Sequence, residues 1–137
     1  MREFNWARVF VCGLVAGSVW TLLSVTLLAF AGGDFLATVR DDHQRTPSGG
    51  LHMFLLFSNL AAGVWATWLY TAIRPRYGPG PKTAVWAGLA WWVIVSMQSA
   101  KWVALLSIPP AAVLIPLAAT LPSIIVATLA GAWFYEK

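Results

Sequence analysis

The sequence predicts an all-α, polytopic membrane protein built as an up-down bundle of four transmembrane helices. Hydrophobic residues make up 59% of the 137 residues and charged residues only 10%, whereas about a quarter of a soluble domain is charged. Four apolar stretches are long enough to cross about 30 Å of hydrocarbon. The segments between them differ in charge, which predicts an orientation. We therefore treat 1–137 as a single four-helix transmembrane domain.

The first predicted span covers about 8–31 and is apolar from Val9 onward. About 20 apolar residues exceed the 7 to 15 of a signal-peptide core, so this stretch fits a bilayer crossing. Gly13 and Gly17 form a G-x-x-x-G step, which lets another helix approach closely, either within the chain or in a dimer. The single cysteine, Cys12, lies in this span, so we interpret it as a small packing residue.

A polar loop at 32–50 follows, and we predict that it lies on the external side of the membrane. It contains Asp41, Asp42 and His43, which suggest a divalent-metal site. Metal sites need more convergent ligands than three neighbours in one segment supply, so the sequence predicts no metal site here.

The second span is predicted at 51–73, with His52 near its outer end and Asn59 about two turns deeper. A cytoplasmic Pro/Gly hinge at 74–83 follows it. Prolines lack a backbone donor and glycines adopt positive φ, so we expect a stiff and specific turn here rather than a flexible linker.

The third span is predicted at 84–107 and contains Gln98 and Lys101, the latter being the single formal charge inside a span. The fourth is predicted at 110–135, beginning at a proline pair that suits a helix start. Pro116 and Pro122 lie inside it and remove backbone hydrogen bonds, which predicts a bent helix.

Basic residues predict that both termini are cytoplasmic, because Lys and Arg in short connecting segments stay on that side. The side of the termini and hinge carries Arg2, Arg8, Arg74, Arg76, Lys82 and Lys137. The opposite loop carries Arg40 and Arg45. Because topology explains the formal charge of +4, the sequence offers no basic face for nucleic acid.

The hinge sequence Ile73-Arg74-Pro75-Arg76-Tyr77-Gly78-Pro79-Gly80-Pro81-Lys82-Thr83-Ala84 resembles a group of uncharacterised small four-span bacterial membrane proteins. The likeness extends to the segments 8–17 and 126–133. It implies the bacterial inner (cytoplasmic) membrane and four spans, and it implies no activity.

Depth in the bundle predicts one candidate ligand site. Four polar groups fall roughly 10 Å below the outer surface at 1.5 Å per residue: Ser24, Asn59, Lys101 and the carbonyl freed by Pro116. Gln98 lies one turn below Lys101 on the same helix face. If they point inward, they form a pocket for an anionic or lipid ligand, since ionisable residues in membranes are commonly functional. The alternative is that Lys101 extends to the outer headgroups while the amides join helices.

Two further sites are weaker. Arg74, Arg76 and Lys82 are candidates for anionic lipid headgroups on the inner leaflet, although topology alone also explains them. His52 is a candidate axial ligand for haem, but a haem or pigment protein usually offers more histidine, so we predict no cofactor.

The function predicted from these observations is a non-catalytic membrane protein. We expect an accessory or assembly subunit, or a homo-oligomeric module, whose partners are lipids and other membrane subunits or itself. The alternatives are a small carrier or channel around Lys101 and a haem- or pigment-binding subunit. An enzyme is not predicted, because no paired carboxylates or activated nucleophile lie at depth and the proline-rich hinge lacks phosphate-binding amides.

Overall fold

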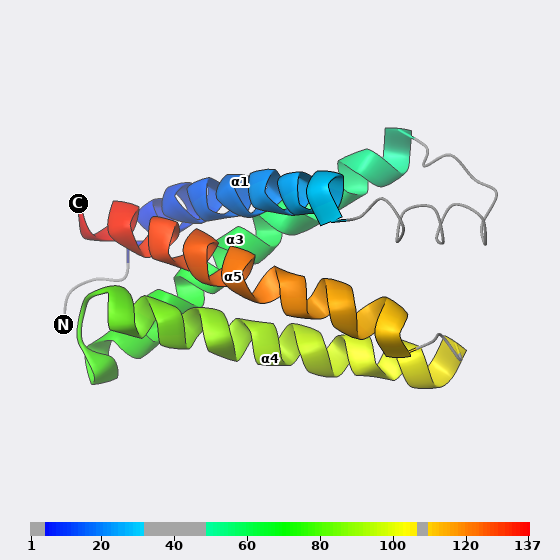
Figure 1. Cartoon of the computed structure of the whole chain (residues 1–137). Helices are drawn as coiled ribbons and strands as arrows, with labels where there is room; N and C mark the ends of the chain where they lie inside the picture. Colours follow the sequence, from blue (N-terminus) through cyan, green and yellow to red (C-terminus); the bar gives the residue numbers. More distant parts are fainter. Residues whose placement is uncertain (1–4, 32–48, 107–109) are drawn as a thin grey trace.

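The computed structural model describes residues 5–31, 49–106 and 110–137, and the regular structure in them is helical. The four helices are α1 (Trp6–Ala31), α3 (Gly49–Tyr77), α4 (Pro81–Leu106) and α5 (Pro110–Glu136). The all-α class is therefore confirmed. Each helix runs along the molecule in the direction opposite to the one before it (Figure 1). The predicted loop at 32–50 lies outside the described residues except for Gly49 and Gly50, which begin α3.

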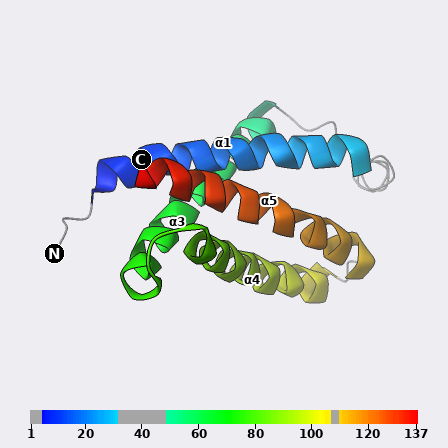
Figure 2. The same cartoon turned by 60° about the vertical axis from the view of Figure 1, so that its left-hand side comes forward.

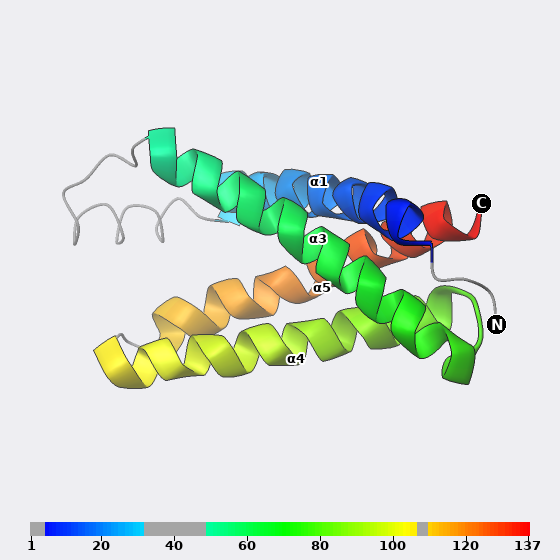
Figure 3. The ribbon, with the colours of Figure 1, turned by 180° about the vertical axis from the view of Figure 1, so that it is seen from behind.

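The four helices do not pack evenly around one axis. α1 packs on α3 and α5, whereas α4 packs on α5 and less extensively on α3. Figures 1 and 2 show α1 and α4 on opposite sides of the molecule, and Figure 3 shows the same separation from behind, with α3 running obliquely across. The first and last helices are therefore neighbours in space, and α4 lies at the edge of the bundle.

Small residues fill the interior of the described structure. Ala16, Thr67, Ala84, Ala87 and Thr128 are all fully buried. Tyr70, Ile124 and Val9 are buried with them, but many large apolar side chains lie on the surface, including Leu22 at 69% exposure, Phe57 at 67% and Phe54 at 66%. Lipid tails are as apolar as leucine, so helices in a membrane associate through close packing of small residues and leave large apolar ones outside. This distribution is typical of a membrane protein and opposite to that of a soluble domain.

Three of the helices contain segments long and apolar enough to cross a membrane: Trp6–Leu27, His52–Tyr77 and Leu117–Glu136. Within the described residues, the segment of α4 that was predicted as a span, which carries Gln98 and Lys101, does not meet the same measure of length and apolarity. The structure is thus consistent with a membrane protein.

Glycines determine how α1 meets α3. A Cβ built on Gly13 would lie 2.3 Å from the Cα of Val64, and one built on Gly17 would lie 2.7 Å from the Cα of Leu60. On the other helix, a Cβ on Gly63 would lie 2.2 Å from the backbone nitrogen of Gly17. The G-x-x-x-G step is therefore occupied by a helix of the same chain, which answers the question that the sequence left open between internal packing and a dimer.

The turn between α3 and α4 is shorter than the predicted hinge at 74–83. α3 continues through Pro75 to Tyr77, and α4 begins at Pro81. Pro75 lies in the last turn of α3, where its fixed φ is helical and its missing N–H removes one backbone hydrogen bond. Gly78, at φ +82°, closes α3 by donating its N–H to the Arg74 carbonyl at 2.8 Å, which is a left-handed C-cap.

α5 is a single helix that contains both predicted internal prolines, Pro116 and Pro122. Pro122 has no N–H, so it leaves the carbonyl one turn earlier without its usual helical donor. In the adjacent turn the Leu117 carbonyl accepts two side-chain hydrogen bonds, from the indole of Trp92 at 3.1 Å and from Thr120 at 2.7 Å. The bend predicted for this helix stays a prediction.

Candidate functional site

Lys101 and Gln98 form a pair on α4, as their spacing on the helix predicts. The Lys101 ammonium donates to the Gln98 side-chain oxygen at 3.2 Å. Both residues are exposed, so they face away from the other described helices. The structure thus brings these two predicted site residues together, on the surface of the molecule rather than in an interior pocket.

Ser24 and Asn59 lie on the other side of the bundle, on α1 and α3, and both are partly buried. The close approaches of Gly13 to Val64 and of Gly17 to Leu60 fix the antiparallel register of these helices. Continuing that register places Asn59 level with Ser18, about 9 Å along the axis from Ser24. Ser24 and Asn59, which were predicted in one layer, therefore lie at different depths, and Lys101 of that layer lies on a third helix.

The outward face of α4 is a continuous stripe at helical spacing. We define it by Trp86, Ala90, Val93, Ile94, Met97, Gln98 and Lys101, all of which are exposed. The stripe is apolar along most of its length and polar at its far end, where the lysine and the amide lie. Because α4 is the edge helix, no other described helix covers this face. We call these seven residues the α4 stripe.

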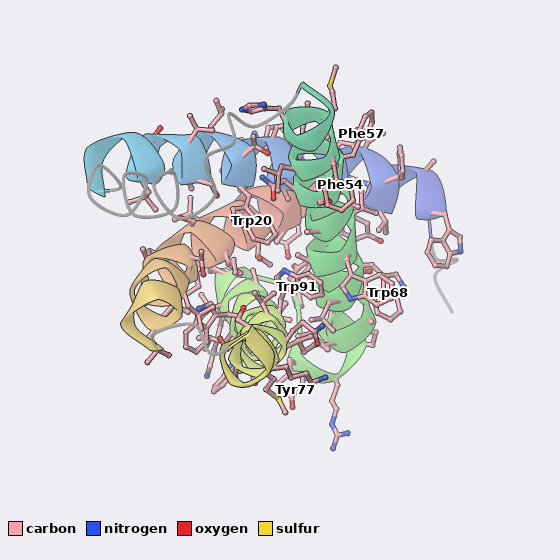
Figure 4. All side chains as sticks on the ribbon, turned by 90° about the vertical axis from the view of Figure 1, so that its right-hand side faces the viewer. Trp20, Phe54, Phe57, Trp68, Tyr77 and Trp91 are labelled. Carbon is pink, nitrogen blue, oxygen red and sulfur yellow. The ribbon has the colours of Figure 1, made fainter. Side chains whose placement is uncertain are left out.

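The inner face of α4 contributes tryptophans to the middle of the bundle. Figure 4 shows Trp91 of α4 and Trp20 of α1 directed toward the space between the helices, and Phe57 directed away from it. The Trp91 indole nitrogen is buried without a hydrogen-bond partner, as is the Thr67 hydroxyl. A buried polar group without a partner costs free energy of desolvation. The Trp91 and Thr67 side chains therefore contribute to the bundle through packing rather than through hydrogen bonds from these atoms.

Aromatic and basic side chains gather where the chain turns from α3 to α4, and we call this the hinge end. The guanidinium of Arg8 lies 5.5 Å from the centre of the Tyr135 ring, and that of Arg74 lies 5.7 Å from the same centre. Tyr135 also meets Tyr70 edge to face at 6.4 Å. Helices α1, α3 and α5 are therefore joined at this end by cation–π and aromatic contacts.

Tyr70 connects the hinge to the last turn of α5. Its ring is fully buried and its hydroxyl donates to the Glu136 carboxylate. The same hydroxyl accepts a hydrogen bond from the Gly80 N–H at 3.3 Å. A single hydroxyl thus provides a hydrogen-bond partner for both the Glu136 carboxylate and the Gly80 N–H. It thereby links α3, the turn and the end of α5.

The predicted headgroup residues take different positions at this end. Arg74 is partly buried against Tyr135, whereas Arg76 and Lys82 are exposed. Lys137 joins them, with its ammonium 3.7 Å from the centre of the Trp133 ring. Sequence reasoning missed the roles of Tyr70, Tyr135 and Glu136. The sequence shows only a tyrosine near the end of each of two predicted helices. That feature by itself indicates a side chain at the membrane interface, not a contact between the helices.

His52 lies in the first turns of α3 and is exposed. Among the residues that the structure describes, no three histidine, cysteine or acidic side chains gather in a group that could hold a metal ion. Asp41, Asp42 and His43 lie outside the described ranges.

The comparisons with known proteins add no relative to this geometry. No protein-family description, curated protein or solved structure matches the chain.

Proposed function

We propose that the protein is a non-catalytic module of a bacterial inner membrane that acts as an accessory or assembly subunit, or as a homo-oligomer. In this proposal all four helices cross the membrane as an up-down bundle, with both termini in the cytoplasm. Small residues inside and large apolar residues outside support the membrane setting. The resemblance of the hinge sequence to small four-span bacterial proteins supports the bacterial inner membrane.

Positive charge at the hinge end supports the orientation. Arg8, Arg74, Arg76, Lys82 and Lys137 come from all four helices to this end. In the described part of the chain the only acidic residue is Glu136, and the Tyr70 hydroxyl engages it. Short segments rich in Lys and Arg stay on the cytoplasmic side, which supports a hinge end inside the cell.

The spacing of two lysines supports a membrane crossing by α4. Lys101 follows Lys82 by 19 residues, which corresponds to about 28 Å of helix. The hydrocarbon core is about 30 Å thick. The helix between these lysines is therefore long enough to cross nearly all of the hydrocarbon, and the apolar part of the α4 stripe would lie within it.

The single observation that carries the subunit function is the outward position of the Gln98–Lys101 pair on the α4 stripe. Polar side chains within membrane helices almost always face protein or water rather than lipid. No described helix of this chain covers them, so a partner helix is the expected cover. A carrier would instead need this pair directed into the bundle, which gives that alternative less support.

Purification tests this proposal. The full chain, tagged and expressed in a bacterial membrane, is extracted in a mild detergent, and its mass and stoichiometric companions are measured by mass spectrometry. We expect a defined complex or homo-oligomer that the Gln98→Leu/Lys101→Met variant loses. Ser58→Leu, an equally polar-to-apolar change at an exposed position of α3, should keep the complex. A wild-type protein that is monomeric and alone would overturn the proposal.

Reporter fusions test the orientation. A reporter active only in the cytoplasm is fused after Lys137 in one protein and inserted after Ser48 in another. We expect a signal from the C-terminal fusion alone. Cytoplasmic activity from the insertion would contradict the placement of both termini inside the cell.

A further inference from the structure

We propose that a groove between the hinge turn and α5 binds one anionic phospholipid, with an acyl chain along the groove and the phosphate at Lys82 and Lys137. The groove encloses about 460 Å³ and is lined by Gly80 and Pro81 of the turn and by Val126, Ala130 and Trp133 of α5, among others. It is a site within this chain, separate from the α4 stripe, and it holds whether or not α4 binds a partner.

The length of the groove matches one membrane leaflet. Its lining on α5 extends from Val126 to Glu136, ten residues or about 15 Å of helix. Half of a hydrocarbon core of about 30 Å is the same distance. The groove therefore runs from the middle of the membrane to the hinge-end headgroup layer, which is the path of a single acyl chain.

The lining is apolar for almost its whole length, and small residues provide its depth. Ala130 and Ala132 lie between the larger Leu129 and Trp133, and Gly80 adds no side chain on the facing turn. Between its two ends the groove is lined by the apolar side chains of α5, which favours a hydrocarbon chain over a polar ligand.

Positive charge is found only at the hinge end of the groove. Pro81 and Glu136 line that end, so their chain neighbours Lys82 and Lys137 flank it. Lys82 is exposed, and the Lys137 ammonium lies over the Trp133 ring. The Glu136 carboxylate also lies at this end and accepts the Tyr70 hydroxyl, so Lys82 and Lys137 together with Glu136 leave a net charge of about +1 at the mouth. An apolar groove with a cationic mouth is complementary to an anionic phospholipid.

The N-terminus of α4 also lies at the mouth of the groove. α4 begins at Pro81, so the partial positive charge of its first turn is directed at the mouth of the groove. This adds to the charge of Lys82 at the position expected for the phosphate. Arg8 and Arg74 are engaged with Tyr135 instead, so Lys82 and Lys137 are the cations that we assign to the headgroup.

Native mass spectrometry tests the charge requirement. The purified full-length protein is titrated with dioleoyl phosphatidylglycerol or dioleoyl phosphatidylcholine, which share acyl chains and differ in headgroup charge. We expect one tightly bound phosphatidylglycerol. Lys82→Gln/Lys137→Gln should weaken it about 30-fold, whereas Lys82→Arg/Lys137→Arg should retain it. Equal affinity for both lipids, or no effect of the glutamine variant, would overturn the proposal.

A second set of variants tests the groove itself. Ala130→Trp fills the groove and should abolish the bound phosphatidylglycerol, and Ala61→Trp, at an exposed position of α3, should retain it. Val126→Trp repeats the test at a lining residue that is 46% exposed, where a larger side chain does not disturb the fold. Thermal unfolding identifies variants that remain folded. Undiminished lipid binding by a folded groove variant would place the lipid elsewhere and refute the proposed site.

Discussion

Gly63 of α3 lies against Gly17 of α1 with no room for a methyl group on either side. A Cβ on Gly63 would stand 2.2 Å from the Gly17 nitrogen and 2.4 Å from its Cα. These neighbours are backbone atoms, which cannot rotate away as a side chain can. The two helices are therefore in backbone contact at this crossing, and the crossing depends on the absence of side chains.

Substitution of Gly63 by alanine should destabilise the protein strongly. The added methyl group must push α1 and α3 apart, and overpacking of this kind costs about 1–3 kcal/mol. Gly49→Ala is the matched control, because nothing lies within 4 Å of a Cβ at that position. Unfolding in mixed detergent micelles measures both variants. Equal stability of the two would contradict the contact.

The turn glycines should be sensitive for a different reason. Gly78 and Gly80 have φ of +82° and +122°, although a Cβ on either would meet nothing within 4 Å. Backbone conformation rather than space opposes alanine there, at a cost of about 1–2 kcal/mol per residue. Asparagine tolerates the left-handed region, so Gly78→Asn should recover part of the loss caused by Gly78→Ala. Thermal unfolding compares the variants, and equal midpoints for Gly78→Ala and the wild type would disprove this.

Removal of the Tyr70 hydroxyl should loosen the hinge end. Tyr70→Phe leaves the Gly80 N–H and the Glu136 carboxylate without this partner, which costs about 1–3 kcal/mol. Faster proteolysis near residues 78–80 should accompany the loss of stability. Tyr77→Phe, at a ring that is 61% exposed, serves as the control and should behave as the wild type. A Tyr70→Phe protein with unchanged proteolysis would show that the hydroxyl holds nothing in place.

The indole of Trp92 should be required for α4 to stay on α5. Trp92→Phe keeps an aromatic ring but removes the hydrogen bond to the Leu117 carbonyl, with an expected loss of about 1 kcal/mol. The exposed Trp86 offers the same substitution without that bond. Hydrogen exchange of amides in α5 near Pro122 measures the effect. We expect faster exchange in Trp92→Phe only, and identical rates in both variants would refute the role of this bond.

Local patterns were sufficient to predict the helices. Apolar length placed four helices within a few residues of those observed, and proline and glycine located the turn between α3 and α4. The turn itself is shorter than predicted, because a proline placed as late as Pro75 can remain helical. Whether a segment forms a helix depends mainly on its own sequence, so composition and turn residues were enough to predict it.

Pairings between helices could not be predicted in the same way. Sequence depth placed Ser24, Asn59 and Lys101 in one layer, but depth does not determine which face of a helix points inward or how far two helices slide. The glycine contacts set the register of α1 against α3, and the edge position of α4 leaves Lys101 exposed. Tyr70 and Glu136 are 66 residues apart, and nothing in the local sequence of either indicates the other.

The packing of α1 against α5 imposes an order on biosynthesis. α1 and α3 can join through their glycines as soon as the ribosome has delivered both. Ala16 and the Cys12 carbonyl, however, pack against Gly131 of α5, which is synthesised after α1, α3 and α4. The nascent protein must therefore leave one side of its first hairpin uncovered until α5 has been synthesised. A chaperone or insertase that shields this side would act before α5 arrives and leave when it docks.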